Sequence, residues 1–480
     1  MGKCFSKSGK NKEVHLSIIR DNIHKHYEME KLLGKGSFGQ VRKAHMLRDP
    51  KRKFAIKTID KGSLKTEKEK KTLKQEIETL LEVDHPNIIK LYESYEDKKY
   101  IHLVTEYCSG GELFDHILEK KRYSEKDAAV VMQSILRAVN HLHKNGICHR
   151  DLKPENFLFA SKEPDAELKI IDFNLSNKFG SKLGRNKRMN TVLGTPYYIA
   201  PEVIKGDYNF KCDLWGCGII MYMLLSGTLP FTGNSHKEIF QRIISEQADL
   251  TGYLWKGISE EALNLLKRLL QKNQSFRLSA EEALRHSWFK EANTEKKIAI
   301  DPQILDSLRR YKTTSLFQKE AMAIIVKDLK IEDIKELKEA FTHYDKSETG
   351  FLSAQEIEEA LVAAGCDLAA DQVSEIIQNA DYKRNGRINY SEFIAATLSS
   401  KMQLNEETLW NAFNHFDVDG TGYITEENVV AALKKTGKQL PLEEVQRMIR
   451  EVDQEKNGKL NFEEFKTMFL EGFNSLNMQL

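Results

Sequence analysis

The sequence predicts an α+β domain followed by an all-α domain, and three observations lead to that prediction. Residues 27–289 begin with short β-branched runs, such as KFAIKTI and YIHLVTEY, and continue with long helical patterns. In EKDAAVVMQSILRAVNHLHKNG, apolar residues recur at intervals of three and four, as on the buried face of a helix. From residue 331 onward the sequence repeats with a fixed period, which indicates a duplicated structural unit.

The composition is that of an ordinary globular protein. The chain has 480 residues, of which 40% are hydrophobic and 30% charged, so sizeable cores can be buried. Its 73 basic and 71 acidic residues leave a net charge of +2, which argues against a nucleic-acid binder. No uncharged apolar run approaches the roughly 18 residues of a membrane span. Six cysteines occur without a C-x-x-C pair, so we expect reduced thiols in a cytoplasmic protein.

The first twelve residues, MGKCFSKSGKNK, fit a lipid anchor. Gly2 and Ser6 match the myristoylation pattern, and Cys4 is a candidate for palmitoylation. One myristoyl chain binds membranes with only about 10⁴ M⁻¹, so stable attachment needs a second acyl chain or nearby basic residues. We expect peripheral membrane anchoring through Gly2 and Cys4. The alternative is a disordered tail that merely begins with Met-Gly.

A glycine-rich run near the start of the α+β domain predicts a phosphate-binding hairpin. LGKGSFGQV places Gly34, Gly36 and Gly39 between two β-patterned runs, where backbone N–H groups can approach phosphates closely. A strand follows instead of the helix that a dinucleotide site would need. The next strand carries Lys57, which can neutralise phosphates, and Glu76 in the helical run LKQEIETLL is its expected partner.

Two downstream motifs supply the rest of a phosphoryl-transfer site. In HRDLKPENFLF, Asp151 can accept a proton from a substrate hydroxyl, Lys153 can stabilise the transferring group, and Asn156 can bind a metal ion. In IIDFN, Asp172 is the expected main ligand of Mg²⁺. Phosphoryl transfer needs in-line positioning and charge neutralisation more than covalent chemistry, and these four residues meet that need.

In this order, and closed by APE, DLWGCG and Arg277, the motifs resemble the protein kinase family across residues 27–289. The resemblance implies a bilobal protein-kinase fold, with ATP and Mg²⁺ as cofactors, and a pair between Glu202 and Arg277. HRDLKPEN together with GTPYY resembles Ser/Thr kinases, in which Thr195 would contact Asp151.

The resemblance also implies roles around the nucleotide. Thr105 falls at the gatekeeper position, while Glu106 and Cys108 would offer backbone hydrogen bonds to adenine. Glu112 would meet the ribose, and together with Glu155 it would favour a basic residue three positions before the target Ser/Thr. The full nucleotide-binding set implied by the resemblance is Leu33, Gly34, Gly36, Gly39, Val41, Lys57, Glu76, Glu106, Cys108 and Glu112.

Two positions depart from the usual pattern. Asn174 replaces the glycine of DFG, and asparagine is among the few residues that tolerate left-handed backbone. This change either alters flipping of the metal-binding segment or is a tolerated exchange. Thr191 stands where related kinases often carry an acidic residue; its phosphate could pair with Arg150, or it is an unmodified surface threonine.

The repeats predict four EF-hand loops. Asp345, Asp381, Asp417 and Asp453 lie 36 residues apart, and each is followed five residues later by glycine. EF-hand ligands come from loop positions 1, 3, 5, 7, 9 and 12. The expected calcium ligands are Asp345, Ser347, Thr349, Phe351 and Glu356 in loop 1; Asp381, Asn385 and Glu392 in loop 2; Asp417, Asp419, Thr421 and Tyr423 in loop 3; and Asp453, Glu455, Asn457, Lys459 and Glu464 in loop 4.

The four loops are unequal. Lys383 at position 3 of loop 2 repels a cation, and Asn428 replaces the terminal glutamate of loop 3. Loops 1 and 4 are therefore the expected calcium sites, and loops 2 and 3 are either weak sites or metal-free scaffolds. Two sites at 100-fold over Kd contribute about 2.7 kcal/mol each, which together reach the roughly 5.5 kcal/mol of a full switch.

The connector before the repeats predicts a basic amphipathic helix. Its apolar residues Ile304, Leu305, Leu308, Leu316, Phe317 and Ile324 alternate with Arg309, Arg310, Lys312 and Lys319. Such a helix suits a calmodulin-like groove and can also block a kinase cleft. A plain linker helix is the alternative.

The whole chain resembles the calcium-dependent protein kinases of plants and protists. That resemblance implies a calcium-activated Ser/Thr kinase that its junction inhibits and its own EF-hands release through an intramolecular contact, in a monomer. Two other interpretations are a pseudokinase scaffold, motivated by Asn174, and a kinase that answers to separate calmodulin. The expected domains are an N-terminal tail at 1–26, a kinase domain at 27–289, an autoinhibitory junction at 290–330, and EF-hand pairs at 331–400 and 401–480.

Overall fold

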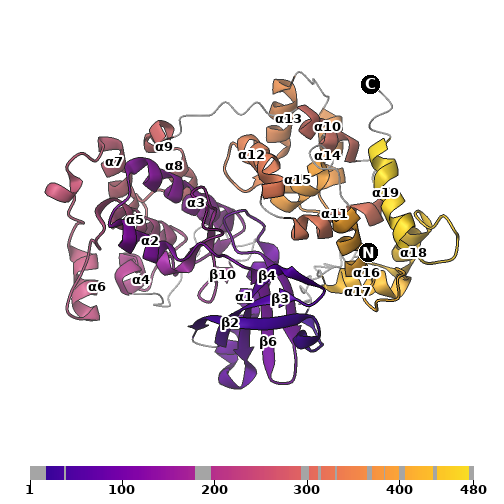
Figure 1. Cartoon of the computed structure of the whole chain (residues 1–480). Helices are drawn as coiled ribbons and strands as arrows, with labels where there is room; N and C mark the ends of the chain where they lie inside the picture. The colour runs from indigo at the N-terminus through magenta and orange to yellow at the C-terminus, as the bar shows by residue number, and fades with distance from the viewer. Residues whose placement is uncertain are drawn as a thin grey trace, which may run out of the picture.

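The computed structural model describes ten stretches of the chain: residues 18–36, 39–178, 196–292, 302–311, 315–329, 332–364, 370–382, 384–398, 406–435 and 440–474. Figure 1 shows a sheet-bearing lobe, a helical lobe beside it, and a separate group of helices formed by the C-terminal part of the chain. No described helix is long and apolar enough to cross a membrane. The expected α+β domain followed by an all-α domain is confirmed.

The first lobe is a six-stranded sheet in the order β1-β5-β6-β4-β3-β2. All neighbouring strands are antiparallel except β1 and β5. Helix α1 lies between β4 and β5 in the chain and begins with a capping box between Thr66 and Glu69. The elements are β1 (Ile18–Ile19), β2 (Tyr27–Gly36), β3 (Gly39–Met46), β4 (Asp49–Asp60), α1 (Glu67–Glu82), β5 (Leu91–Glu96) and β6 (Tyr100–Glu106).

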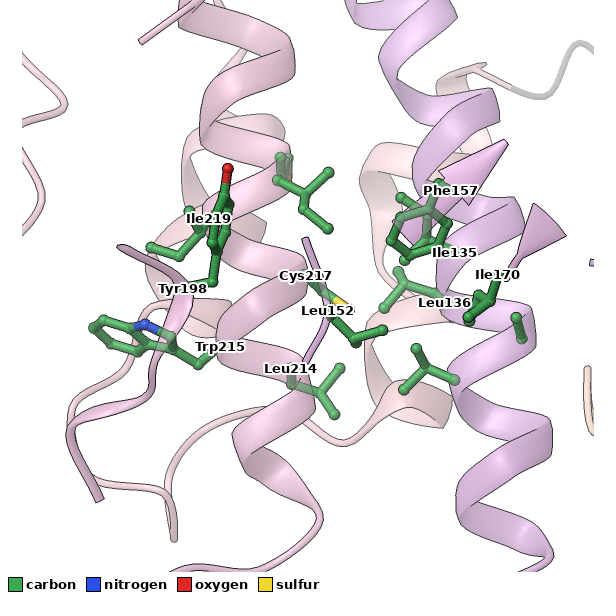
Figure 2. Close-up of a cluster of buried hydrophobic side chains, with 14 of the residues drawn as sticks. Ile135, Leu136, Leu152, Phe157, Ile170, Tyr198, Leu214, Trp215, Cys217 and Ile219 are labelled. Carbon is green, nitrogen blue, oxygen red and sulfur yellow. The ribbon is translucent and has the colours of Figure 1, made fainter. Parts of the chain in front are cut away.

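The second lobe is mainly helical and is built around α5, which is buried along its whole length after Lys211. In Figure 2, Leu152, which follows the predicted catalytic residue Asp151, lies between α3 and α5, so the core holds this part of the chain in place. The helices are α2 (Leu113–Lys120), α3 (Glu125–Lys144), α4 (Pro201–Ile204), α5 (Lys211–Ser226), α6 (His236–Ser245), α7 (Glu260–Leu269), α8 (Ala280–Leu284) and α9 (Ser287–Ala292). The short strands are β7 (Ile147–Cys148), β8 (Phe157–Phe159), β9 (Leu168–Ile170) and β10 (Asn177–Lys178).

The connector forms two helices, α10 (Pro302–Arg310) and α11 (Leu316–Asp328), so the expectation of one helix is wrong. Ser315 has extended backbone, and its hydroxyl accepts a hydrogen bond from the N–H of Gln318. That N-cap starts a new helix instead of continuing the previous one. The predicted apolar face is nevertheless real, because Leu308 and Phe317 are buried in one core with the helices of the repeats.

The repeats fold into paired helix–loop–helix units, as expected. Leu352 pairs with Ile388 across one pair of loops, and Ile424 pairs with Leu460 across the other. The aliphatic residue two positions after each loop glycine therefore joins the loops in pairs. The elements are α12 (Lys335–Tyr344), β11 (Phe351–Leu352), α13 (Ala354–Ala363), α14 (Ala370–Ala380), β12 (Ile388–Asn389), α15 (Tyr390–Thr397), α16 (Glu406–Phe416), α17 (Glu426–Lys435), α18 (Leu442–Arg450) and α19 (Phe462–Asn474).

Candidate active site and calcium-binding loops

Lys57 and Glu76 form the ion pair that the sequence predicted. The Lys57 ammonium lies 2.6 Å from a carboxylate oxygen of Glu76, whose side chain is buried in α1. Burial raises the pKa of Glu76 above its usual value, although the Lys57 charge opposes that rise. The ammonium also donates a hydrogen bond of 3.2 Å to the side-chain oxygen of Asn174. Lys57 is thus held from two sides.

Asn174 does not have left-handed backbone. Among the described residues, five that are not glycine have positive φ, and Asn174 is not one of them. The left-handed tolerance of asparagine is therefore not used at this position. Instead, the Asn174 side chain reaches Lys57, and the backbone N–H of Asn174 donates to the Asp172 carboxylate at 3.0 Å.

The loop that carries Asp151 is held by the buried carboxylate of Asp213. Its two oxygens accept hydrogen bonds from the N–H groups of His149 at 2.9 Å and Arg150 at 2.8 Å. Burial tends to raise the pKa of Asp213, but bonds from His143 and from this backbone hold it below the usual value. Arg150 has a φ of 69°, a left-handed conformation that costs a non-glycine residue about 1–2 kcal/mol. The Asp213 carboxylate offsets that strain just before Asp151.

Asp151, Lys153 and Asn156 converge on one point. The Lys153 ammonium lies 3.2 Å from the Asp151 carboxylate, and the Asn156 amide donates to the same carboxylate at 3.2 Å. A second bond from Asn156 reaches the Asp151 carbonyl oxygen at 2.8 Å. Since its amide nitrogen donates to Asp151, the Asn156 oxygen is left as the ligand atom for a metal ion. The arrangement of these three residues therefore fits an Mg²⁺-assisted transfer.

The expected adenine-binding segment begins at the end of β6. Glu106 pairs with Phe54 across the sheet, and its side chain is held by the Lys90 N–H at 2.8 Å and by Lys169 at 3.1 Å. Burial raises the pKa of Cys108 to about 12, with a smaller contribution from Glu106, so its thiol is neutral. The Thr105 hydroxyl donates to the Ala55 carbonyl oxygen at 3.1 Å.

The expected nucleotide-binding residues that precede Lys57 lie on the two strands of the glycine-rich hairpin. Gly34 and Val41 pair across β2 and β3, and Gly36 pairs with Gly39 at the tip. A Cβ at Gly39 would lie 1.9 Å from the Thr58 carbonyl oxygen, so this close strand approach requires glycine. Leu33 is 41% exposed.

An acidic patch and a buried ion pair complete the kinase-like region. Burial raises the pKa of Glu112, and the charges of Asp115 and Glu155 raise it further, so Glu112 and Glu155 share one negative region.

The expected pair of Glu202 and Arg277 is confirmed as a bidentate ion pair in the core. Arg277 is only 1% exposed.

The four loops share a backbone geometry built on their first aspartate. In each loop the N–H groups of positions 5 and 6 donate to that carboxylate, at 2.6 to 3.1 Å. The glycine at position 6 has positive φ in all four. Position 4 also has positive φ, at Glu348, Arg384, Gly420 and Lys456. This second left-handed position was missed, and Gly420 was its only signal in the sequence.

Loops 1 and 4 turn their terminal glutamates inward. Glu356 accepts from the N–H of Ser347 at 2.9 Å, and Glu464 accepts from the N–H of Glu455 at 3.0 Å. Burial raises the pKa of Asp345 to about 6, and the neighbouring carboxylates of Glu356 and Glu348 add to the rise, because these acidic groups are packed together away from water. A bound cation would relieve that cost, so these donors fit Ca²⁺.

Loops 2 and 3 differ from each other. Glu392 is fully buried and accepts two hydrogen bonds from Asn389, at 2.7 and 2.8 Å, so loop 2 keeps an inward carboxylate. In loop 3, the side-chain oxygen of Asn428 accepts from the N–H of Thr425, and its amide bonds to Asp419. Position 12 of loop 3 therefore offers one amide oxygen, which is already hydrogen-bonded, where loops 1 and 4 offer the two oxygens of a carboxylate.

In each pair of loops, a cation–aromatic contact that sequence reasoning missed links the two residues at position 7. Arg387 lies 3.7 Å from the ring centroid of Phe351, and Lys459 lies 3.5 Å from that of Tyr423. The expected position-7 ligand is a carbonyl oxygen, so these side chains are free to join the loops.

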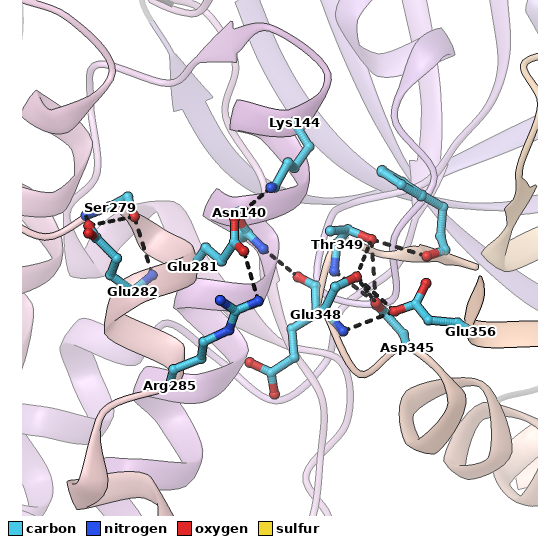
Figure 3. Close-up of polar contacts among 12 residues, drawn as sticks. Asn140, Lys144, Ser279, Glu281, Glu282, Arg285, Asp345, Glu348, Thr349 and Glu356 are labelled. Carbon is cyan, nitrogen blue, oxygen red and sulfur yellow. Dashed lines mark hydrogen bonds and ion pairs between the residues drawn. The ribbon is translucent and has the colours of Figure 1, made fainter. Parts of the chain in front are cut away.

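Loop 1 also docks on helix α3 of the kinase-like lobe. Arg137 pairs with the Glu348 carboxylate at 2.8 Å, and the Asn140 amide donates to the Glu348 carbonyl oxygen at 2.7 Å. The His141 ring lies 2.9 Å from the carbonyl oxygen of Thr349. Figure 3 shows the Asn140 contact beside the ligand cluster of Asp345 and Glu356, so the calcium loop itself forms the interface.

Several predicted residues lie outside the described stretches of the chain. They are the acylation candidates Gly2 and Cys4, the activation-segment threonines Thr191 and Thr195, and Lys383 of loop 2.

The comparisons with known proteins agree with this geometry. A protein kinase domain profile matches residues 27–289, and an EF-hand domain pair profile matches residues 334–398 and 406–470. The chain is 36% identical to calcium-dependent protein kinase 33 of Arabidopsis thaliana over 94% of its own length and 86% of that protein. It is 37% identical to calcium-dependent protein kinase 3 of Plasmodium berghei, over 93% of this chain and 80% of that protein. The chain therefore belongs to the calcium-dependent protein kinase family, in which an ATP- and Mg²⁺-dependent Ser/Thr kinase domain and Ca²⁺-binding EF-hands share one polypeptide.

Proposed function

We propose that residues 27–289 transfer the γ-phosphate of ATP to Ser or Thr, with the roles expected from the sequence. Asp151 receives the proton of the substrate hydroxyl, and Lys153 stabilises the transferring phosphoryl group. Lys57, held by Glu76 and Asn174, neutralises the α- and β-phosphates. Mg²⁺ held by Asp172 and Asn156 supplies charge neutralisation at the phosphates. The convergence of Lys153 and Asn156 on the Asp151 carboxylate carries this proposal.

The regulatory part of the proposal concerns residues 290–330 as the junction. Without calcium the junction occludes the substrate cleft; with calcium, EF-hand pairs 331–400 and 401–480 capture it and release the enzyme. Support comes from Leu308 and Phe317, which are buried in the core of the EF-hand helices. Phe317 lies 5.0 Å from Phe416 and 6.0 Å from Phe465, between ring centroids. These contacts support the proposed capture of the junction by the EF-hand helices.

Two finer features complete the proposal. Glu112 and Glu155 bind a basic residue three positions before the target, which their shared negative charge supports. Acylation of Gly2 and Cys4 in the tail, residues 1–26, anchors the monomer to a membrane, as the sequence pattern suggests.

One experiment tests the function. The purified full chain is assayed for phosphate transfer to a basic Ser peptide, with calcium or chelator and without added calmodulin. We expect transfer in calcium and at least tenfold less in chelator, with Lys57→Met as the inactive control. Transfer absent in both conditions would support a scaffold, and transfer indifferent to calcium would contradict the switch.

A further inference from the structure

A series of ion pairs of alternating charge runs from the first EF-hand to the expected adenine-binding segment, Glu106 to Cys108, which is called the hinge below. It starts on α12, where the Lys338 ammonium contacts the Glu167 carboxylate just before β9. The other oxygen of Glu167 lies 3.2 Å from the Lys169 ammonium. Lys169 in turn lies 3.1 Å from Glu106, at the end of β6. Three consecutive ion pairs therefore connect two segments that are 232 residues apart (338 minus 106).

The inner residues of this series of ion pairs are buried. The side chains of Lys169, Glu167 and Glu106 are 7%, 9% and 16% exposed. Lys169 also donates to the Pro86 carbonyl oxygen at 2.9 Å, so three partners hold it. Burial works to raise the pKa of Glu167, but the Lys169 and Lys338 ammoniums lower it below the usual value. Glu167 is thus ionised because cations flank it on both sides.

Removal of the outer cation would therefore disturb the inner pairs. A buried ion that loses its partner is strongly penalised, because the remaining charge is neither hydrated nor compensated. Without Lys338, the Glu167 carboxylate depends on Lys169 alone and draws it away from Glu106. The Glu106 side chain also accepts from the Lys90 N–H at 2.8 Å, and the Glu106 N–H donates to the Lys90 carbonyl oxygen at 3.1 Å. Because the side chain and the backbone of Glu106 share this partner, a shift of the carboxylate also shifts the hinge backbone.

We propose that Lys338 is a positioning residue for the ATP site: when the first EF-hand docks, its ammonium completes the chain Lys338–Glu167–Lys169–Glu106 and sets the hinge for adenine. This inference rests on the proposed role of the Glu106 backbone in adenine binding. Docking of the EF-hand module and nucleotide binding then stabilise each other. Because such coupling is reciprocal, ADP must raise the calcium affinity of the full chain by the same factor.

The structure offers a matched control on the same helix. Lys335 lies 3.0 Å from Asp165 on the same β8–β9 hairpin, but these side chains are 60% and 73% exposed. Lys335→Gln removes the same charge from the same interface without touching the buried chain. Surface pairs of this kind contribute about 0–1 kcal/mol.

The test measures steady-state kinetics of the full chain in saturating calcium. We expect Lys338→Gln to raise KM for ATP about fivefold, at the low end of typical coupling free energies, with KM for the peptide unchanged. Lys338→Arg should keep KM for ATP near the value of the parent chain. Lys335→Gln should have the same KM for ATP as the parent chain. In calcium titrations, ADP should raise the apparent calcium affinity of the parent and fail to do so for Lys338→Gln.

A second variant keeps the proposal testable if Lys338→Gln is poorly folded. Glu167→Gln breaks the chain at its centre and should raise KM for ATP at least as much. An unchanged KM for ATP in both variants would overturn the coupling while leaving calcium-dependent transfer intact. An equal rise in KM for ATP and for peptide would instead indicate a general structural role. A parent that transfers no phosphate would contradict the proposed function, not the coupling.

Discussion

The side-chain oxygen of Asn174 accepts a hydrogen bond from the ammonium of Lys57 at 3.2 Å. The residue that replaces the usual glycine therefore touches the lysine that is expected to hold the phosphates. Glu76, at 2.6 Å, is the nearer partner of the same ammonium. Asn174 is thus an additional support for Lys57.

Asn174→Gly should leave the enzyme active. Lys57 keeps its ion pair with Glu76, so only one hydrogen bond of about 1 kcal/mol is lost, and kcat/KM should fall about fivefold. Peptide phosphorylation in saturating calcium measures this change. A loss beyond a hundredfold would show that Asn174 is indispensable.

Asn428→Glu should create a calcium site in loop 3. The new carboxylate can supply the bidentate position-12 ligand that Asn428 lacks, while Asp417 and Asp419 already stand at positions 1 and 3. Isothermal titration calorimetry should then find one more bound calcium ion per chain than in the parent. Glu464→Gln is the matched change in loop 4 and should remove one ion.

Arg277→Met should destabilise the helical lobe strongly. The side chain is 1% exposed, and its loss leaves the Glu202 carboxylate buried without its partner, which costs about 3–5 kcal/mol. Arg285→Ala is the control, because its pair with Glu281 lies at the surface, with Arg285 66% exposed. Thermal unfolding should give a much lower midpoint for Arg277→Met than for Arg285→Ala. Equal midpoints would contradict a stabilising role of the buried Arg277–Glu202 pair.

Gly350→Ala should undock the first EF-hand from the kinase lobe. A Cβ there would lie 2.5 Å from both the His141 and His85 rings. Gly386 has the same loop position and a φ of 79° against 76°, but a Cβ on it meets nothing within 4 Å. Both variants carry the backbone strain of about 1–2 kcal/mol, so only the clash distinguishes them.

Small-angle scattering in calcium measures that difference. The radius of gyration should increase for Gly350→Ala and stay at the parent value for Gly386→Ala. Equal radii for the two variants would mean that loop 1 does not hold the module in place.

Cys108 should resist alkylation at neutral pH. The thiolate is the reactive form, and burial raises the pKa of Cys108 to about 12, against about 8.5 for a free thiol. At pH 8 the labelling rate should be at least about a thousandfold below that of a free cysteine, and it should rise about tenfold per pH unit toward pH 11. Peptide mapping after iodoacetamide treatment measures the rate at Cys108; a rate that is flat with pH would contradict the raised pKa.

Most of the catalytic geometry could be predicted because local motifs specify it. HRDLKPEN places Asp151, Lys153 and Asn156 within five positions of one another, so their convergence needs only one short loop. The loop aspartates were predictable for the same reason. The structure of the connector was harder to predict. Its hydrophobic pattern marks the buried face but does not reveal the N-cap at Ser315, which divides the connector into two helices.

The contacts that sequence reasoning missed join distant segments. Arg137 and Glu348 are 211 residues apart, and neither position stands out from other surface charges in the sequence. The same holds for Lys338 and Glu167. Such pairs depend on how two domains dock, and neither periodicity nor motif spacing contains that information.

The burial of α10 and α11 changes where the enzyme ends and the sensor begins. With Phe317 fully buried beside Phe416 and Phe465, the connector supplies part of the sensor's own interior. A fragment that began at α12 would have four EF-hands whose apolar interior is exposed. That surface would bind other apolar helices. The chain is therefore best divided between α9 and α10. A sensor fragment that begins at α10 would include the two helices that fill its interior.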